Sequence, residues 1–170
     1  MTNHNTSEAP RARAAVMTVS DAGSKGERED TAGPACQDLL RGAGFEIAIT
    51  SIVPDEPAVI AELLRRWADD EHIAIVITTG GTGLSPRDRT PEATQQVCDY
   101  LVPGIGEAMR AASLNVTPMA MISRALAGVR GQTLIVNLPG SERGARENLA
   151  VVLPVIAHAV NLLGGDTAHS

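Results

Sequence analysis

The stretch IAIVITTGGTG, residues 73–83, decides the fold that this sequence predicts. Its first seven residues are mostly apolar or β-branched and do not alternate with charged residues, which is typical of a strand buried on both faces of a sheet. The glycines that follow tolerate left-handed backbone angles and let a ligand approach the chain closely. The stretch therefore predicts a central strand that ends in a tight turn.

Strands and helices alternate on either side of this stretch. Apolar runs predict the strands, and apolar residues at helical spacing with proline and glycine at the ends predict the helices. This alternation indicates an α/β domain with a mostly parallel central sheet. The expected strands are residues 14–19, 45–53, 73–79 and 132–138, and the expected helices lie within residues 34–44, 54–72, 91–102, 105–115 and 143–163.

The length of 170 residues suits one domain with a substantial core. We expect that domain to cover residues 12–164, with tails at 1–11 and 165–170. The first ten residues are polar and lack the apolar run of a signal peptide, and charged or polar residues interrupt the apolar stretches that follow. The sequence therefore predicts a cytoplasmic domain that does not enter a membrane.

The composition argues against nucleic acid as a partner. The formal net charge is −6 and the isoelectric point is about 5.1, which disfavours binding to a phosphate polymer or an anionic membrane. Only Phe45, Trp67 and Tyr100 are aromatic, too few for a surface that stacks single-stranded bases. Small phosphorylated ligands stay open, because a few local donors can outweigh the average charge.

The nucleophilic and metal-binding side chains form no recognisable motif. Cys36 and Cys98 lack metal-ligand spacing, and two cysteines in a chain of this size predict buried free thiols in a reducing cytosol. The four histidines lie in the tails, before a strand or on the last helix, which argues against a histidine-based catalytic triad. We therefore expect chemistry that needs no protein nucleophile.

Polar residues follow all four expected strands. Ser20 and Asp21 follow the first strand, residues 54–56 the second, residues 78–83 close the third, and residues 137–141 close the fourth. Ligands of open α/β sheets bind beyond the carboxyl ends of the strands. The sequence therefore predicts a ligand-binding rim built from these four strand ends.

The glycine turn TTGGTG allows two interpretations. Its glycines could serve only a tight strand-to-helix turn. Alternatively, successive backbone N–H groups turned the same way could bind an anion. No Gly-Lys-Ser/Thr follows, which excludes a Walker A loop, and the glycine spacing does not fit the dinucleotide fingerprint.

The segment PRDRTPEA places a carboxylate beside this turn. We expect Thr90 to cap a helix whose first residue is Pro91, so that Asp88 lies just ahead of the helix. Asp88 could be a capping or salt-bridging residue. It could instead hold Mg²⁺ against substrate phosphates, with Arg87 or Arg89 neutralising charge.

Two further strand ends carry candidate site residues. Asp55 could start the next helix, or it could face Asp88 across a cleft, an arrangement suited to Mg²⁺ with its one or two protein carboxylates. Gly140 and Ser141 precede the last helix, where free N–H groups could bind an anion while Ser141 caps the helix. These two roles of Ser141 are compatible.

Five segments occur in the order typical of the MogA/MoaB family of molybdenum-cofactor biosynthesis: VSDAGSKGEREDTAG, PDE, TTGGTG with RDRTPEA, PGIGEAMR, and SRALAGVRGQTLIVNLPGS. The resemblance covers roughly residues 14–163. It implies a three-layer α/β/α fold, usually trimeric. It also implies Mg²⁺-dependent transfer of AMP from ATP to the terminal phosphate of molybdopterin, with release of pyrophosphate. The product would pass to a molybdate-insertion protein.

The resemblance also implies which residues act. Asp55 and Asp88 match the family's essential acidic positions and are the expected catalytic and metal-binding residues. A MoaB-type homologue or a non-catalytic molybdopterin-binding scaffold is the alternative, because such proteins share these motifs. The expected substrate- and nucleotide-binding residues are Ser20, Asp21, Thr79, Gly80, Gly81, Thr82, Gly83, Arg87, Pro139, Gly140 and Ser141.

Overall fold

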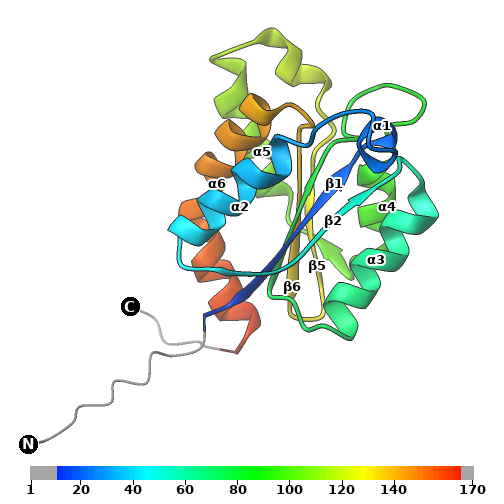
Figure 1. The fold of residues 1–170 in the computed structure, drawn as a ribbon. Coiled ribbons are helices and arrows are strands. Elements are labelled where there is room, and N and C mark those ends of the chain that lie inside the picture. The colour runs from blue at the N-terminus through cyan, green and yellow to red at the C-terminus, as the bar shows by residue number, and fades with distance from the viewer. Residues whose placement is uncertain (1–10, 166–170) are drawn as a thin grey trace, which may run out of the picture.

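The computed structural model describes residues 11–165, which fold into three layers (Figure 1). A six-stranded sheet lies between two layers of helices, so the expected three-layer α/β/α fold is confirmed. The predicted tails fall almost wholly outside the described residues. The elements are β1 (Arg13–Val19), α1 (Asp21–Ser24), α2 (Ala32–Gly42), β2 (Glu46–Val53), α3 (Pro57–Asp69), β3 (Ile75–Thr79), α4 (Thr90–Val97), β4 (Tyr100–Leu101), α5 (Pro103–Leu114), η1 (Pro118–Ile122), β5 (Ala127–Arg130), β6 (Thr133–Leu138) and α6 (Glu142–Leu163).

The sheet has the strand order β2-β1-β3-β6-β5-β4, with β3 near its centre. Strand β3 pairs in parallel with β1 on one side and β6 on the other, and all its residues are buried. Thr79 stands opposite Thr18 of β1 and Leu138 of β6. The carboxyl ends of these strands therefore meet at one edge of the sheet.

The far edge of the sheet departs from the prediction. Helix α4 ends at Val97, and β4 pairs antiparallel with β5, where the sequence predicted helix through residue 102 and no strand at β5. Both strands are short and carry little periodic signal. Gly128 of β5 must lack a side chain, because a Cβ there would lie 2.6 Å from the Sγ of Cys98.

Two apolar clusters fix the helices to the sheet. Val16, Ile77 and Val136 point into the cluster that packs under α2, α5 and α6. Met17 and Ile135 point to the opposite face, under α3 and α4. Side chains alternate between the faces of a strand, so each buried strand serves both clusters. This two-sided burial explains the near-continuous apolar runs in the sequence.

Helix α6 is the one helix of residues 11–165 whose length and composition would also let it cross a membrane. Its residues Leu149, Val152 and Ile156 belong to the cluster shared with α2 and α5. Packing in the outer helix layer thus accounts for the apolar stripe of this helix. Val151, Val155 and Leu162 remain exposed on its other side.

The segment between β1 and α2 is more ordered than the predicted loop. Ser20 caps the short helix α1 by accepting a hydrogen bond from the N–H of Gly23. Helix α2 begins at Ala32, earlier than the predicted start at Pro34. The carboxylate of Asp30 accepts a hydrogen bond from the N–H of Gly33 and satisfies the first turn.

Candidate functional site

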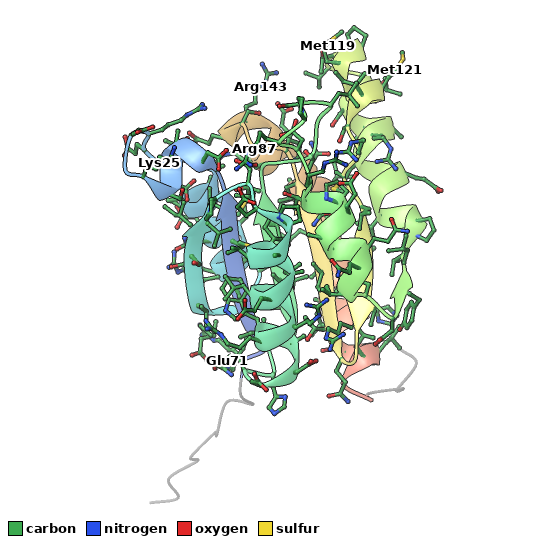
Figure 2. The ribbon with its side chains drawn as sticks, turned by 90° about the vertical axis from the view of Figure 1, so that its right-hand side faces the viewer. Lys25, Glu71, Arg87, Met119, Met121 and Arg143 are labelled. Carbon is green, nitrogen blue, oxygen red and sulfur yellow. The ribbon has the colours of Figure 1, made fainter. Side chains whose placement is uncertain are left out.

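The four predicted strand ends converge on one cleft of about 400 Å³. Figure 2 shows Lys25, Arg87 and Arg143 at this end of the molecule and Glu71 at the opposite end. Asp21 and Arg87 lie on the outer margin of the cleft. Thr82, Gly83 and Pro139 line an adjoining hollow. The predicted residues that line the cleft are Ser20, Asp55, Thr79, Gly80, Gly81, Asp88, Gly140 and Ser141.

The turn after β3 accepts only glycine at two successive positions. Gly80 and Gly81 have φ angles of 94° and 67°, in the left-handed region that other residues rarely adopt. A Cβ on Gly80 would lie 2.2 Å from the backbone oxygen of Val19. A Cβ on Gly81 would lie 2.2 Å from the Oγ1 of Thr90. The turn is thus held by close backbone packing as well as by conformation.

Thr90 fastens this turn to helix α4. It is the first residue of α4, which corrects its predicted role as the helix cap, because Arg89 occupies the cap position. The Thr90 hydroxyl donates to the backbone oxygen of Gly80 at 2.9 Å, and its N–H donates to the oxygen of Gly81 at 3.1 Å. The buried hydroxyl therefore satisfies the turn, not the helix end.

Backbone N–H groups that donate no hydrogen bond within the described residues border the cleft and the adjoining hollow. Within residues 11–165, the N–H groups of Gly81, Thr82 and Gly83 donate no hydrogen bond. Across the cleft, the 22-residue helix α6 begins after Ser141, whose Oγ accepts from the N–H of Gly144 at 3.1 Å. The first N–H groups of a long helix lack partners inside the helix and attract anions. The cleft is therefore suited to phosphate groups.

Asp55 and Asp88 each present one free carboxylate oxygen. Asp55 Oδ2 accepts from the N–H of Asp21 at 2.9 Å, and Asp88 Oδ2 accepts from the N–H of Ser85 at 3.0 Å. Within the described part of the chain, no hydrogen bond reaches Oδ1 of either residue. Both residues line the same cleft, in agreement with the predicted pairing.

Burial, together with the nearby charges of Asp21 and Asp88, raises the pKa of the Asp55 carboxyl. Asp55 therefore takes up a proton at a higher pH than an exposed aspartate does. A cation bound beside Asp55 would favour the ionised form and oppose this shift. Ionisation of Asp55 and binding of a cation beside it would therefore favour each other.

The chemistry of these oxygens fits Mg²⁺. No group of three or more His, Cys, Asp or Glu side chains within residues 11–165 could hold a metal by itself. Mg²⁺ does not require such a group, since it commonly takes one or two carboxylates and completes its octahedron with substrate phosphates and water. Asp55 and Asp88 could supply those carboxylates, beside N–H donors for the phosphates.

Arg87 is engaged with carboxylates at the edge of the cleft. Its Nε and Nη2 donate to the two oxygens of Asp21 at 3.0 and 2.9 Å, and Nη2 also lies 2.9 Å from Oε1 of Glu56. The hydrogen bonds from Arg87 hold the pKa of Asp21 below its ordinary value. Asp21 also accepts from the N–H of Asp55 at 3.0 Å. Arg87 thus joins three strand-end loops. That it also binds substrate stays a prediction.

Sequence reasoning missed Arg124. Its Nε donates to the backbone oxygen of Gly83 at 2.8 Å and its Nη2 to that of Asp88 at 2.6 Å. Its Nη1 pairs with Glu92 of α4. Arg124 lies before β5 and not at a carboxyl end of a predicted strand, so no local pattern distinguished it from a surface arginine.

An adjoining hollow of about 290 Å³ extends the cleft towards α5 and η1. Aliphatic and methionine side chains form one wall, and backbone and hydroxyl groups form the side nearest the cleft. Lining residues of the adjoining hollow include Thr82, Gly83, Val116, Met119, Pro139 and Ser141.

A larger cleft of about 510 Å³ lies at the other end of the sheet, around His72 and Gly131, where the strands begin.

The two cysteines are poorly suited to act as nucleophiles. Burial raises the pKa of the Cys36 thiol to about 12 and that of the Cys98 thiol to about 11. Both are free, but Cys98 is only partly buried, in contrast to the prediction for both residues. The reactive thiolate form is therefore scarce at neutral pH.

Comparison with known proteins gives consistent matches. A family model described as a probable molybdopterin binding domain matches residues 15–158. The chain is 43% identical over 156 residues to the molybdopterin adenylyltransferase of Helicobacter pylori strain J99, a match that covers 89% of this chain and 87% of that protein. It is 41% identical over 155 residues to the molybdenum cofactor synthesis protein cinnamon of Drosophila melanogaster, where the match covers 90% of this chain but only 26% of the longer protein.

A solved structure agrees with these matches. The crystal structure of the molybdopterin biosynthesis enzyme MoaB from Thermus thermophilus aligns with a TM-score of 0.86 and 55% sequence identity. The alignment covers 91% of this chain and 97% of that one. The fold is therefore shared over nearly the whole described chain.

Proposed function

We propose that this chain, which belongs to the MogA/MoaB family of molybdenum-cofactor biosynthesis, is a molybdopterin adenylyltransferase. In the proposed reaction the terminal phosphate of molybdopterin attacks the α-phosphorus of ATP. A P–O bond to molybdopterin forms, and the bond between the α- and β-phosphates breaks to release pyrophosphate. The observation that carries the proposal is the pair Asp55 and Asp88, each with a free oxygen in a cleft lined by unused N–H donors.

The chain's own groups supply binding and orientation. The N–H groups of residues 81–83 and of the start of α6 would hold phosphate oxygens on opposite sides of the cleft. Two anions must approach each other, and fixed donors lower their repulsion as negative charge moves to the leaving pyrophosphate. Phosphoryl transfers depend mainly on such positioning and electrostatics, so a protein nucleophile is not needed. The high pKa values of the cysteines agree with this mechanism.

Asp55 and Asp88 are the residues that would hold Mg²⁺. When bound, the ion would neutralise charge on the phosphates and on the leaving pyrophosphate. The N–H of Asp21 and the N–H of Ser85 each occupy one oxygen of these carboxylates and so keep the other oxygen directed to a fixed position. Ionised Asp55 is required for this role, so its contribution is lost as the pH falls through its raised pKa.

The adjoining hollow suits the ring of one substrate. Adenine and pterin both carry flat rings, and the chain offers few aromatic side chains for stacking. The wall formed by Val116 and Met119 can instead contact such a ring through aliphatic and thioether groups. Thr82, Gly83 and Ser141 border this hollow, and Gly81 and Ser141 border the main cleft, so ring and phosphate sites would be continuous.

Three further expectations belong to the same proposal. We expect the chain to act in the cytoplasm, to form a homotrimer and to pass its product to a molybdate-insertion protein. Apolar side chains exposed near η1 offer a surface for such contacts. Met119 is 62% and Met121 72% exposed, and Figure 2 shows both residues projecting there. Patches of this kind commonly serve protein contacts.

A MoaB-type molybdopterin-binding scaffold without turnover is the second candidate. The chain is 55% identical to the Thermus molybdopterin biosynthesis enzyme MoaB and 43% identical to the Helicobacter protein named molybdopterin adenylyltransferase, so a MoaB-type role is the alternative within the family. Both candidates share the cleft. They differ in whether ATP is cleaved.

Pyrophosphate release distinguishes the two candidates. We expect the purified chain, supplied with ATP and Mg²⁺, to release pyrophosphate only when molybdopterin is added, because the attacking phosphate belongs to molybdopterin. The measurement is a coupled pyrophosphate assay, with molybdopterin binding followed in parallel by fluorescence. A chain that binds molybdopterin but releases no pyrophosphate would be the scaffold, and the proposed transfer would be wrong.

A further inference from the structure

We propose that Arg124 is a positioning residue that holds the loop of residues 82–89 and thereby sets the place of the Asp88 carboxylate. This inference deepens the proposed function and rests on it for its catalytic consequence. That the Arg124 guanidinium holds the loop is inferred from hydrogen bonds within the chain and does not depend on the proposed function.

Arg124 meets the loop and the following helix at four points. Its backbone N–H donates to the oxygen of Thr82 at 2.9 Å, and its Nε donates to the oxygen of Gly83 at 2.8 Å. Its Nη2 donates to the backbone oxygen of Asp88 at 2.6 Å, and its Nη1 pairs with Glu92. A single side chain therefore connects both ends of the loop with the first turn of α4.

Besides Arg124, the side chain of Arg87 links this loop to the rest of the protein. Residues 84–87 are exposed, and the apolar residue Leu84 is 64% exposed. The hydrogen bonds between Ser85 and Asp88 lie within the loop and do not fix it to the rest of the protein. Arg87 reaches outwards to two carboxylates at the margin of the cleft. The guanidinium of Arg124 is thus the anchor on the side of β5.

An arginine suits this task better than a lysine. The planar guanidinium carries donors in a fixed fork, so it can bind two carbonyl oxygens and a carboxylate at once. A lysine ammonium is a point charge that would satisfy fewer of these acceptors with weaker control of direction. Residues that orient a metal-binding carboxylate typically change metal affinity or activity by about 10- to 100-fold when replaced.

Arg130 provides a matched control. It lies at the other end of α4, where its Nη1 donates to the backbone oxygen of Val97 at 2.9 Å. Its Nε and Nη2 bind the carboxylate of Asp69 at 2.9 and 2.6 Å. Arg130 therefore makes the same kinds of contact as Arg124, but none of them is with the loop of Asp88.

The experiment compares Arg124→Gln, Arg124→Lys and Arg130→Gln in the full chain. Hydrogen exchange is measured on the amides of residues 83–89, Mn²⁺ affinity by electron paramagnetic resonance, and AMP transfer over a range of Mg²⁺ concentrations. For Arg124→Gln we expect exchange in the loop to rise at least about tenfold. We expect Mn²⁺ affinity to fall, and the Mg²⁺ concentration for half-maximal rate to rise, by about 10-fold or more. Arg124→Lys should fall between this variant and the wild type.

Excess Mg²⁺ gives the sharpest readout. It should restore much of the rate of Arg124→Gln, because the carboxylates are present but displaced, while the KM for molybdopterin stays within about twofold. Arg130→Gln should keep wild-type loop exchange and Mg²⁺ dependence whatever it loses in melting temperature. If Arg124→Gln matches Arg130→Gln in loop exchange and in Mn²⁺ affinity, the inference is wrong. If the wild type transfers no AMP, the proposed function fails, and loop exchange with Mn²⁺ affinity still decides the role of Arg124.

Discussion

Replacing Asp88 with Asn is expected to lower the rate of AMP transfer by at least about 100-fold. The amide keeps the size of the carboxylate and can still accept from the N–H of Ser85 through its oxygen, so the loop should retain its shape. What is lost is the negative charge at the free oxygen, which we propose as a ligand of Mg²⁺. Rates are to be measured at saturating ATP and molybdopterin, with molybdopterin binding checked separately.

Asp38→Asn is the matched control for this substitution. Asp38 lies on α2, and its side chain is 73% exposed. Within residues 11–165 it pairs only with Arg41, one turn along the helix. Surface pairs of this kind contribute little to stability, so the control should keep the wild-type rate. Full adenylylation by Asp88→Asn, with molybdopterin still bound, would remove Asp88 from the catalytic assignment.

Replacing Gly80 with Ala is expected to destabilise the protein by about 3 kcal/mol. The substitution adds a strained left-handed backbone angle to a close contact, since the new Cβ would stand 2.2 Å from the backbone oxygen of Val19. Neither the end of β1 nor the end of β3 can move without disturbing the parallel pairing between them. Chemical denaturation followed by circular dichroism measures the loss.

Gly44→Ala separates the two causes. Gly44 has a φ of 92°, close to that of Gly80, but a Cβ there would meet no atom within 4 Å. We expect it to cost only about 1 to 2 kcal/mol, from backbone strain alone. Equal losses for the two variants would show that the contact with Val19 contributes nothing.

An acidic chain is proposed here to bring two polyanions together. The net charge of −6 opposes this, but the charges that matter lie near the cleft. Lys25 and Arg143 stand at the same end of the molecule as Arg87 (Figure 2), and the N–H groups of the glycine turn and of α6 add partial positive charge there. Arg87 also neutralises Asp21 and Glu56 at the margin. Local donors thus offset the unfavourable average field.

The central sheet and the convergence of its strand ends could be predicted because they follow from local patterns. A run such as residues 73–79 indicates burial on both faces, and parallel strands necessarily end at one edge of the sheet. Once the strands were assigned, Asp55 and the glycine turn had to lie near each other. The structure places both against one cleft.

The remaining features depend on partners far along the chain. Strands β4 and β5 are too short to show a period, and each exists because the other pairs with it. Arg124 contacts residues about forty positions earlier in the sequence, so no spacing pattern indicates its role. Thr90 has the sequence context of a helix cap, but its hydroxyl donates to Gly80, which only the folded turn brings within reach.

The most direct test of the account follows the α-phosphate of ATP. The wild-type chain is incubated with Mg²⁺, molybdopterin and ATP labelled at the α-phosphorus, and the products are separated and counted. We predict that label appears in adenylylated molybdopterin in equal amount to the pyrophosphate released, and that Asp55→Asn and Asp88→Asn each slow its appearance by at least about 100-fold. Label that stays in ATP, or that enters free AMP while molybdopterin is unchanged, would contradict the account.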